Sequence, residues 1–147
     1  MTSRTKRPKS ALPFVFTEHG ALMLASVLRS EVAIEMEVLR SRAGAPIIIN
    51  SGYRSPQLNK KIGGVPTSNH LTGCAVDIRV ENMEQLIRYA AILLDISNET
   101  HQDFDELLIE KRSASPLGSS KNRYGAIWLH FAVRPSNNRR KVSLIQA

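Results

Sequence analysis

The sequence predicts an α+β domain with a small, mostly antiparallel sheet of about four strands and helices packed against one face. Four short segments carry strand patterns, and they lie at residues 46–50, 74–80, 104–110 and 126–133. Two longer segments, at residues 31–43 and 83–96, show the apolar spacing of helices. With 147 residues, of which 42% are hydrophobic, the chain is large enough to bury one globular core.

The amino-terminal part divides into a tail and a helical segment. Residues 1–12 are basic, and we expect them to form a disordered tail. Residues 13–44 are expected to be helical, with Thr17 as the cap of a first helix over residues 18–28. A second helix follows and stops before Gly44, because glycine favours the left-handed conformation found at helix ends.

Residues 45–147 are expected to form the main domain, which begins with the short buried strand at residues 46–50. A helix over residues 55–62 follows, and the glycines and proline of residues 63–66 break it. The last two strands are joined by residues 113–124, which are rich in serine, glycine, lysine and arginine. A loop of this length is often functional or disordered, so it is a candidate lid.

Three side chains with metal-binding chemistry are spaced so that two strands and a turn bring them together: His70, Asp77 and His130. Alternation in the strand at residues 74–80 puts Asp77 on the face opposite to its apolar neighbours. A carboxylate buried there needs a metal or a hydrogen-bonded partner. Gly73 lets the turn that carries His70 fold back over Asp77. Two imidazoles and a carboxylate are typical ligands of catalytic zinc, which keeps its fourth position for water.

The same residues also allow an interpretation without a metal, and their spacing alone favours neither this interpretation nor zinc binding. Histidines near aromatic residues are often hydrogen-bonded core groups, and Asp77 is also compatible with a surface ion pair. The single cysteine, Cys74, excludes a closed thiolate zinc site and an internal disulfide. By alternation it points away from Asp77, which predicts a small core residue. His19 and His101 lack a matching ligand environment, and we expect both to be non-catalytic.

A series of short motifs occurs in a fixed order along the chain: Ser51-Gly52-Tyr53-Arg54-Ser55, Leu58-Asn59, Ile62-Gly63-Gly64, Ser68-x-His70-x-x-Gly73-x-Ala75-x-Asp77 and Trp128-x-His130. In this order they resemble the zinc D-Ala-D-Ala carboxypeptidase family, which includes the endolysin-type peptidases of phages. The resemblance runs over residues 46–145 and takes in the run Asn138-Arg139-Arg140-Lys141-Val142 near the carboxyl terminus.

This resemblance implies a role for each matching residue. His70, Asp77 and His130 would bind zinc, and Arg54 would anchor the substrate or stabilise its developing oxyanion. Ser68 would belong to the same substrate pocket. The planar guanidinium fork of Arg54 independently suits a carboxylate or carbonyl better than a lysine would. The alternative for Arg54 is a surface arginine in a turn.

A general base is also needed, because the attacking water must lose a proton and the leaving amine must gain one. Many members of the family carry an acidic residue three positions before the last histidine, where this sequence has Ile127. The strand at residues 104–110 offers Glu106 and Glu110 on one face. We expect Glu110 to lie beside the metal and act as the base, while Glu106 contacts solvent or an arginine.

The resemblance implies zinc-dependent hydrolysis of a peptide bond in peptidoglycan stem peptides. The motifs do not encode whether the bond joins two D-alanines, as in a carboxypeptidase, or L-alanine and D-glutamate, as in an endopeptidase. Zinc is the expected cofactor. The sequence carries no indication of the oligomeric state.

The formal charge of +7 suits anionic partners, which include both the bacterial wall and nucleic acid. The charge gathers toward the termini, at residues 4–9 and 134–141. Residues 12–35 also resemble the end of an amino-terminal domain of phage antirepressors. The alternative function is therefore a DNA-binding or regulatory module without hydrolytic activity. Nucleic acid is the less favoured partner, because no complete recognition-helix unit is present.

No apolar run is long enough to span a bilayer, and no signal-peptide core follows the charged start. We therefore expect no membrane insertion and accumulation in the cytoplasm on synthesis. The protein would act on the cell wall if it is released or delivered by a phage.

Overall fold

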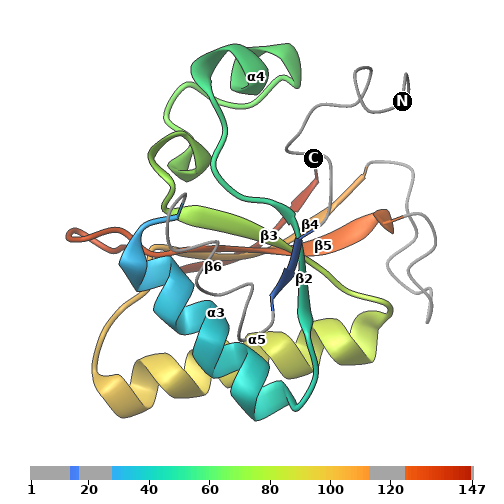
Figure 1. The fold of residues 1–147 in the computed structure, drawn as a ribbon, viewed down its shortest axis with the longest axis vertical. Coiled ribbons are helices and arrows are strands. Elements are labelled where there is room, and N and C mark those ends of the chain that lie inside the picture. Colours follow the sequence, from blue (N-terminus) through green and yellow to red (C-terminus); the bar gives the residue numbers. More distant parts are fainter. Residues whose placement is uncertain (1–13, 17–27, 113–124, 147) are drawn as a thin grey trace.

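The computed structural model describes residues 14–16, 28–112 and 125–146 (Figure 1). The elements in this part of the chain confirm the predicted α+β class. In chain order they are β1 (Phe14–Phe16), α3 (Ser30–Ala43), β2 (Ile47–Ser51), α4 (Pro56–Lys61), the 3-10 turn η2 (Asn69–Thr72), β3 (Ala75–Arg79), α5 (Met83–Thr100), β4 (Glu106–Lys111), β5 (Ile127–Ala132) and β6 (Lys141–Gln146).

The described strands form one six-stranded sheet in the order β1-β2-β3-β5-β4-β6. Neighbouring strands run antiparallel, except that β4 and β6 run parallel. The expectation of a smaller, mostly antiparallel sheet is therefore wrong: the sheet is mixed, and β1 and β6 extend it at its two edges. The four inner strands, β2, β3, β5 and β4, are the ones that the sequence predicted.

The parallel edge strand β6 arises because the chain turns back around the start of β4. The backbone N–H groups of Arg140 and Lys141 donate to the carbonyls of Phe104 and Asp105, at 2.8 and 3.0 Å. This strand was not among those predicted from the sequence, and its apolar side chains Val142 and Leu144 are 59% and 51% exposed. A strand with little buried surface shows weak periodicity against its basic surroundings.

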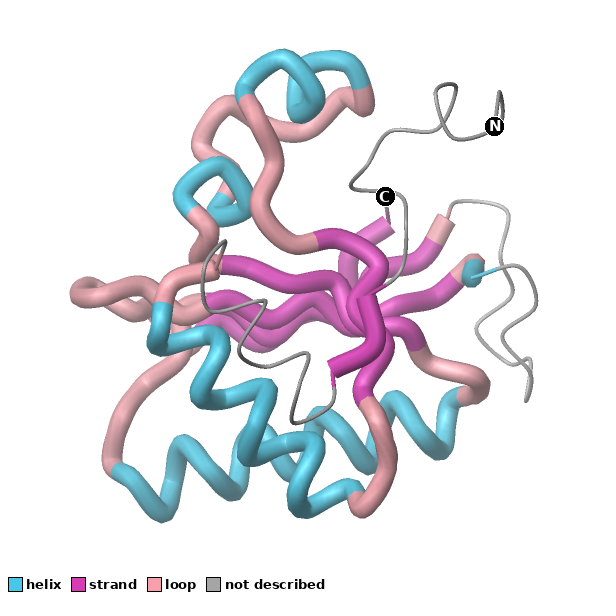
Figure 2. The backbone as a smooth tube through the Cα atoms, in the orientation of Figure 1, coloured by secondary structure: helices cyan, strands magenta, loops and turns pink. Residues whose placement is uncertain are grey.

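Helices α3 and α5 cover one face of the sheet, whereas α4 and η2 lie on the opposite side (Figures 1 and 2). The core lies between the sheet and the two long helices. It is formed by apolar side chains of α3, α5 and the strands, including Val32, Met36, Leu39, Leu86, Leu93, Ile49, Val76, Ile78, Leu129 and Phe131. Because strand residues alternate between faces, burying Val76 and Ile78 under α3 and α5 sends Asp77 to the opposite face, on the side of α4 and η2.

Most helix boundaries agree with the sequence. α3 ends before Gly44, which has a φ of 71°, and Ser55 caps α4 by accepting a hydrogen bond from the Leu58 N–H at 3.2 Å. α5 extends beyond the predicted residue 96 to Thr100. Among the described residues, no helix combines the length and apolar character needed to cross a bilayer. Three predictions fall on residues that the structure does not describe, which are 1–13, 17–27 and 113–124. They are the tail 1–12, all but the last residue of the helix 18–28, and the whole loop 113–124.

The segment before residue 45 packs into the same core as the sheet, because Val32, Met36 and Leu39 of α3 are fully buried. β1 also pairs with β2 in that sheet. The proposed division of the chain at residue 45 stays a prediction.

Several carboxyl-terminal arginines are engaged inside the molecule. Asp105 is fully buried and accepts hydrogen bonds from Arg134 Nη2 at 3.0 Å and from Arg139 Nε and Nη2 at 2.9 and 2.8 Å. Burial raises the pKa of Asp105, but the bonds from Arg139 and Arg134 outweigh it and lower the pKa well below its usual value. Arg140 lies over the ring of Phe104 and donates to Ser97 at 2.7 Å. These arginines therefore stabilise the turn between β5 and β6.

Candidate metal centre

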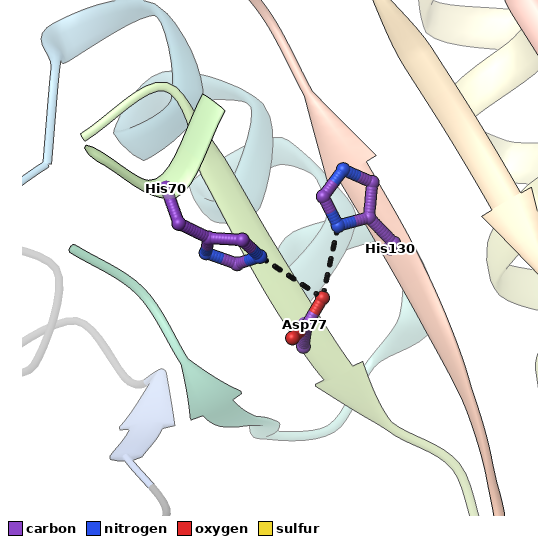
Figure 3. A group of neighbouring side chains, drawn as sticks. All are labelled: His70, Asp77 and His130. Atoms are coloured by element: carbon purple, nitrogen blue, oxygen red, sulfur yellow. Dashed lines mark hydrogen bonds and ion pairs between the residues drawn. The ribbon is translucent and has the colours of Figure 1, made fainter. Parts of the chain in front are cut away.

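The three predicted metal ligands meet on the face of the sheet opposite to α3 and α5 (Figure 3). His70 comes from η2, Asp77 from β3 and His130 from β5, and register pairs Asp77 with His130. One ligand atom from each lies within 4.8 Å of the others. All three side chains are buried, at 2%, 7% and 6% exposure. The structure thus brings together the residues that the sequence selected.

The turn around η2 fixes His70. Ser68 Oγ accepts from the His70 backbone N–H at 3.2 Å, and Gly73, with a φ of 72°, ends the turn. His70 Nδ1 lies 2.7 Å from the carbonyl oxygen of Gly52. Because a carbonyl only accepts, Nδ1 carries the proton and Nε2 presents its lone pair. That Nε2 lies 3.3 Å from Asp77 Oδ1, at the centre of the group.

His130 uses its two ring nitrogens differently from His70. Its Nδ1 lies 3.0 Å from Asp77 Oδ1, and its Nε2 lies 3.2 Å from Glu106 Oε1. Asp77 Oδ1 is therefore shared by both imidazoles. Burial lowers the pKa of His130, but hydrogen bonds to Asp77 and Glu106 outweigh it and raise the pKa to about 10. The two carboxylates therefore favour positive charge at this point of the site.

The donor set fits zinc. His70 Nε2, His130 Nδ1 and Asp77 Oδ1 offer two imidazole nitrogens and one carboxylate oxygen. Zinc binds such ligands tetrahedrally and leaves one position for water when it is catalytic. Burial raises the pKa of Asp77, but His70 and His130 lower it far below the ordinary range, so the carboxylate is ionised and ready to bind a metal.

Arg54 lies at the site, as the sequence predicted. Its Nη2 donates to Asp77 Oδ2 at 3.1 Å and its Nε donates to Ser51 Oγ at 3.1 Å. The Arg54 side chain is 13% exposed, which argues against the alternative of a surface arginine. Asp77 thus turns one oxygen toward the imidazoles and the other toward Arg54. Ser68, in contrast, uses its hydroxyl to cap η2.

Glu106 and Glu110 lie on the same face of β4, on either side of the position opposite His130. Glu110 pairs in register with Trp128 and accepts from Trp128 Nε1 at 2.6 Å. Burial and the nearby charge of Asp77 raise the pKa of Glu110, although its bond from Trp128 acts the other way. A half-buried carboxylate that interacts electrostatically with Asp77 and both histidines is a candidate general base.

Glu106 makes one expected contact and two that the sequence did not indicate. Its Oε2 lies 3.3 Å from Arg139 Nη2, which is the arginine contact expected for it. Its Oε1 also accepts from His130, and from Asn69 Nδ2 at 2.7 Å. The hydrogen bond from His130 lowers the pKa of Glu106. A weak signal for Asn69 exists in the sequence, because it is a polar residue inside the motif that carries His70.

Two imidazoles and a carboxylate beside a half-buried glutamate form an arrangement typical of metal-dependent hydrolases. The sequence comparison identifies the family: the model of the peptidase M15 family matches residues 15–113, and the chain belongs to this family. This confirms the resemblance seen in the motifs. The match contains His70, Asp77 and Glu110, whereas His130 lies beyond it and reaches the site through the pairing of β5 with β3. No curated protein shows a significant match.

Proposed function

We propose that the protein is a zinc-dependent peptidase that hydrolyses a peptide bond in peptidoglycan stem peptides. The observation that carries the proposal is the convergence of His70, Asp77 and His130 on one sheet face, with ligand atoms within 4.8 Å of one another. Membership of the peptidase M15 family supports a peptidase. The protein would reach its substrate after release or delivery by a phage.

The residues of the site divide the chemistry among them. His70, Asp77 and His130 would hold zinc, which would acidify a bound water and polarise the carbonyl of the substrate. Glu110 would accept the proton of that water and return it to the leaving amine. Trp128 holds one carboxylate oxygen of Glu110 at 2.6 Å and so fixes its orientation. Arg54 would bind the carboxylate or carbonyl of the substrate.

The structure weakens one argument for the alternative, a DNA-binding module, because some of the basic side chains at the carboxyl end are paired within the domain. At the carboxyl end, Arg134 and Arg139 pair with Asp105, and Arg140 pairs with Asp103 at 3.2 Å. Part of the charge that suggested an anionic partner is therefore compensated within the domain. The family match also begins at residue 15, inside the segment that resembles an antirepressor.

A digest of purified muropeptides by zinc-loaded protein, followed by mass analysis, tests the proposal. We expect cleavage of a stem peptide. Loss of a terminal alanine identifies a carboxypeptidase, whereas a cut between L-alanine and D-glutamate identifies an endopeptidase. Salt-dependent binding of duplex DNA, with every muropeptide left intact by zinc-loaded protein, would contradict the proposal and favour the alternative.

A further inference from the structure

We propose that Glu106, held in place by Asn69, is a positioning residue that orients His130 so that its Nδ1 faces the metal. This inference rests on the proposed zinc site, but not on which substrate the site cleaves. It gives Glu106 a role different from that of Glu110 on the same strand face.

An imidazole can bind a metal through either ring nitrogen, so something must select one. In His130, Nε2 lies 3.2 Å from Glu106 Oε1, while Nδ1 lies 3.0 Å from Asp77 Oδ1. Nδ1 faces the Asp77 oxygen that His70 Nε2 also faces, so a metal held by Asp77 and His70 would take the lone pair of Nδ1. The ring would then keep its proton on Nε2 and donate it to the Glu106 carboxylate, which only accepts. Metal-binding histidines usually donate their other N–H to such a partner, which fixes the ring. For His70, the corresponding partner is the Gly52 carbonyl, at 2.7 Å from Nδ1.

Glu106 can hold His130 only if it is itself held. Asn69 Nδ2 donates to Glu106 Oε1 at 2.7 Å and to Asp105 Oδ2 at 2.8 Å. Both neighbours of this amide are carboxylates, so its NH2 end must face them. Arg139 Nη2 lies 3.3 Å from the other oxygen of Glu106. The Glu106 side chain is 16% exposed, so these bonds compete with little water.

Asn69 also connects the two histidines. It immediately precedes His70 in η2, and it is 9% exposed. Its amide ties η2 to Asp105 and Glu106 at the start of β4, and Asp105 is in turn held by Arg134 and Arg139. The turn that carries one ligand and the carboxylate that orients the other are therefore joined by a single side chain.

These contacts also distinguish the role of Glu106 from that of Glu110. Both oxygens of Glu106 are already engaged, one by His130 and Asn69 and the other by Arg139. The Glu110 contact with Trp128 uses Oε2. Removing Glu106 should therefore act on the metal, and removing Glu110 on the proton transfer.

The test is the zinc affinity of the whole chain, measured by competition with a chelating dye in the absence of substrate. Glu106→Ala should weaken zinc binding by about 10- to 100-fold, as is typical when an outer partner of a ligand is lost. Glu106→Gln should recover much of the affinity, because an amide oxygen still accepts from His130. Glu84→Ala removes an exposed carboxylate of α5, away from the site; it is the control and should leave zinc affinity unchanged.

A folded Glu106→Ala protein that binds zinc as tightly as the parent would overturn the proposal. If that variant does not fold, Asn69→Ala decides, since it should weaken zinc binding by loosening Glu106, and an unchanged affinity overturns the proposal. If the parent protein binds zinc but cleaves no muropeptide, the proposed function fails. The effect of the Glu106 variants on zinc affinity can still be measured, because that assay contains no substrate.

Discussion

Replacing His130 by alanine is expected to remove zinc from the protein and to abolish hydrolysis. The variant loses one of three ligand atoms and leaves Asp77, which lies 3.0 Å from His130 Nδ1, with one imidazole partner. The loss should exceed the roughly 10- to 100-fold that follows removal of an outer partner. Elemental analysis of the purified variant measures the zinc directly, and His70→Ala should behave in the same way.

The matched control for these variants is His101→Asn. His101 is exposed and follows α5 with a φ of 56°, a conformation that asparagine tolerates well. It should keep both zinc and turnover, as expected for a non-catalytic histidine. Stoichiometric zinc retained by the double variant His70→Ala, His130→Ala would show that the metal lies elsewhere.

Glu110→Gln is expected to keep zinc and to lose on the order of a hundredfold or more in turnover. Glutamine preserves the size of the side chain and can still accept from Trp128, which lies 2.6 Å from the carboxylate. It cannot take the proton of the attacking water. Turnover of a muropeptide and zinc content, measured on the same preparation, separate a defect in proton transfer from a defect in metal binding.

Glu106→Gln is the comparison for that experiment and should lose much less turnover. Near-normal turnover of Glu110→Gln with unchanged zinc would assign the base elsewhere, with Glu106 and Asp105 the next candidates. Asp105 is the weaker of these two, because it is fully buried and held by two arginines. Loss of zinc in Glu110→Gln would instead make Glu110 a support of the metal.

Local patterns predicted the central strands and the face on which the site lies. In β3, alternation alone separates Asp77 from Val76 and Ile78, and burial of those two under the helices leaves a single possible face. The approach of His70 was also predictable, because Gly73 ends its turn only a few residues before Asp77. These features depend on neighbours in the sequence.

The contacts that the sequence did not reveal depend on register and on distant segments. Glu106 meets His130 because β4 and β5 pair with Leu108 opposite His130, and alternation does not fix which residues lie opposite one another. The pairing of Asp105 with Arg139 joins residues 34 positions apart. The parallel strand β6 likewise follows from the path of the chain around β4.

Stepwise addition of zinc to the metal-free protein, with muropeptide hydrolysis followed by mass analysis, tests the central claim most directly. Hydrolysis should rise with added zinc and level off at about one ion per chain, as expected for a single site with three protein ligands. Undiminished hydrolysis by the metal-free protein in excess chelator would contradict the claim. So would saturation with zinc that leaves every stem peptide intact.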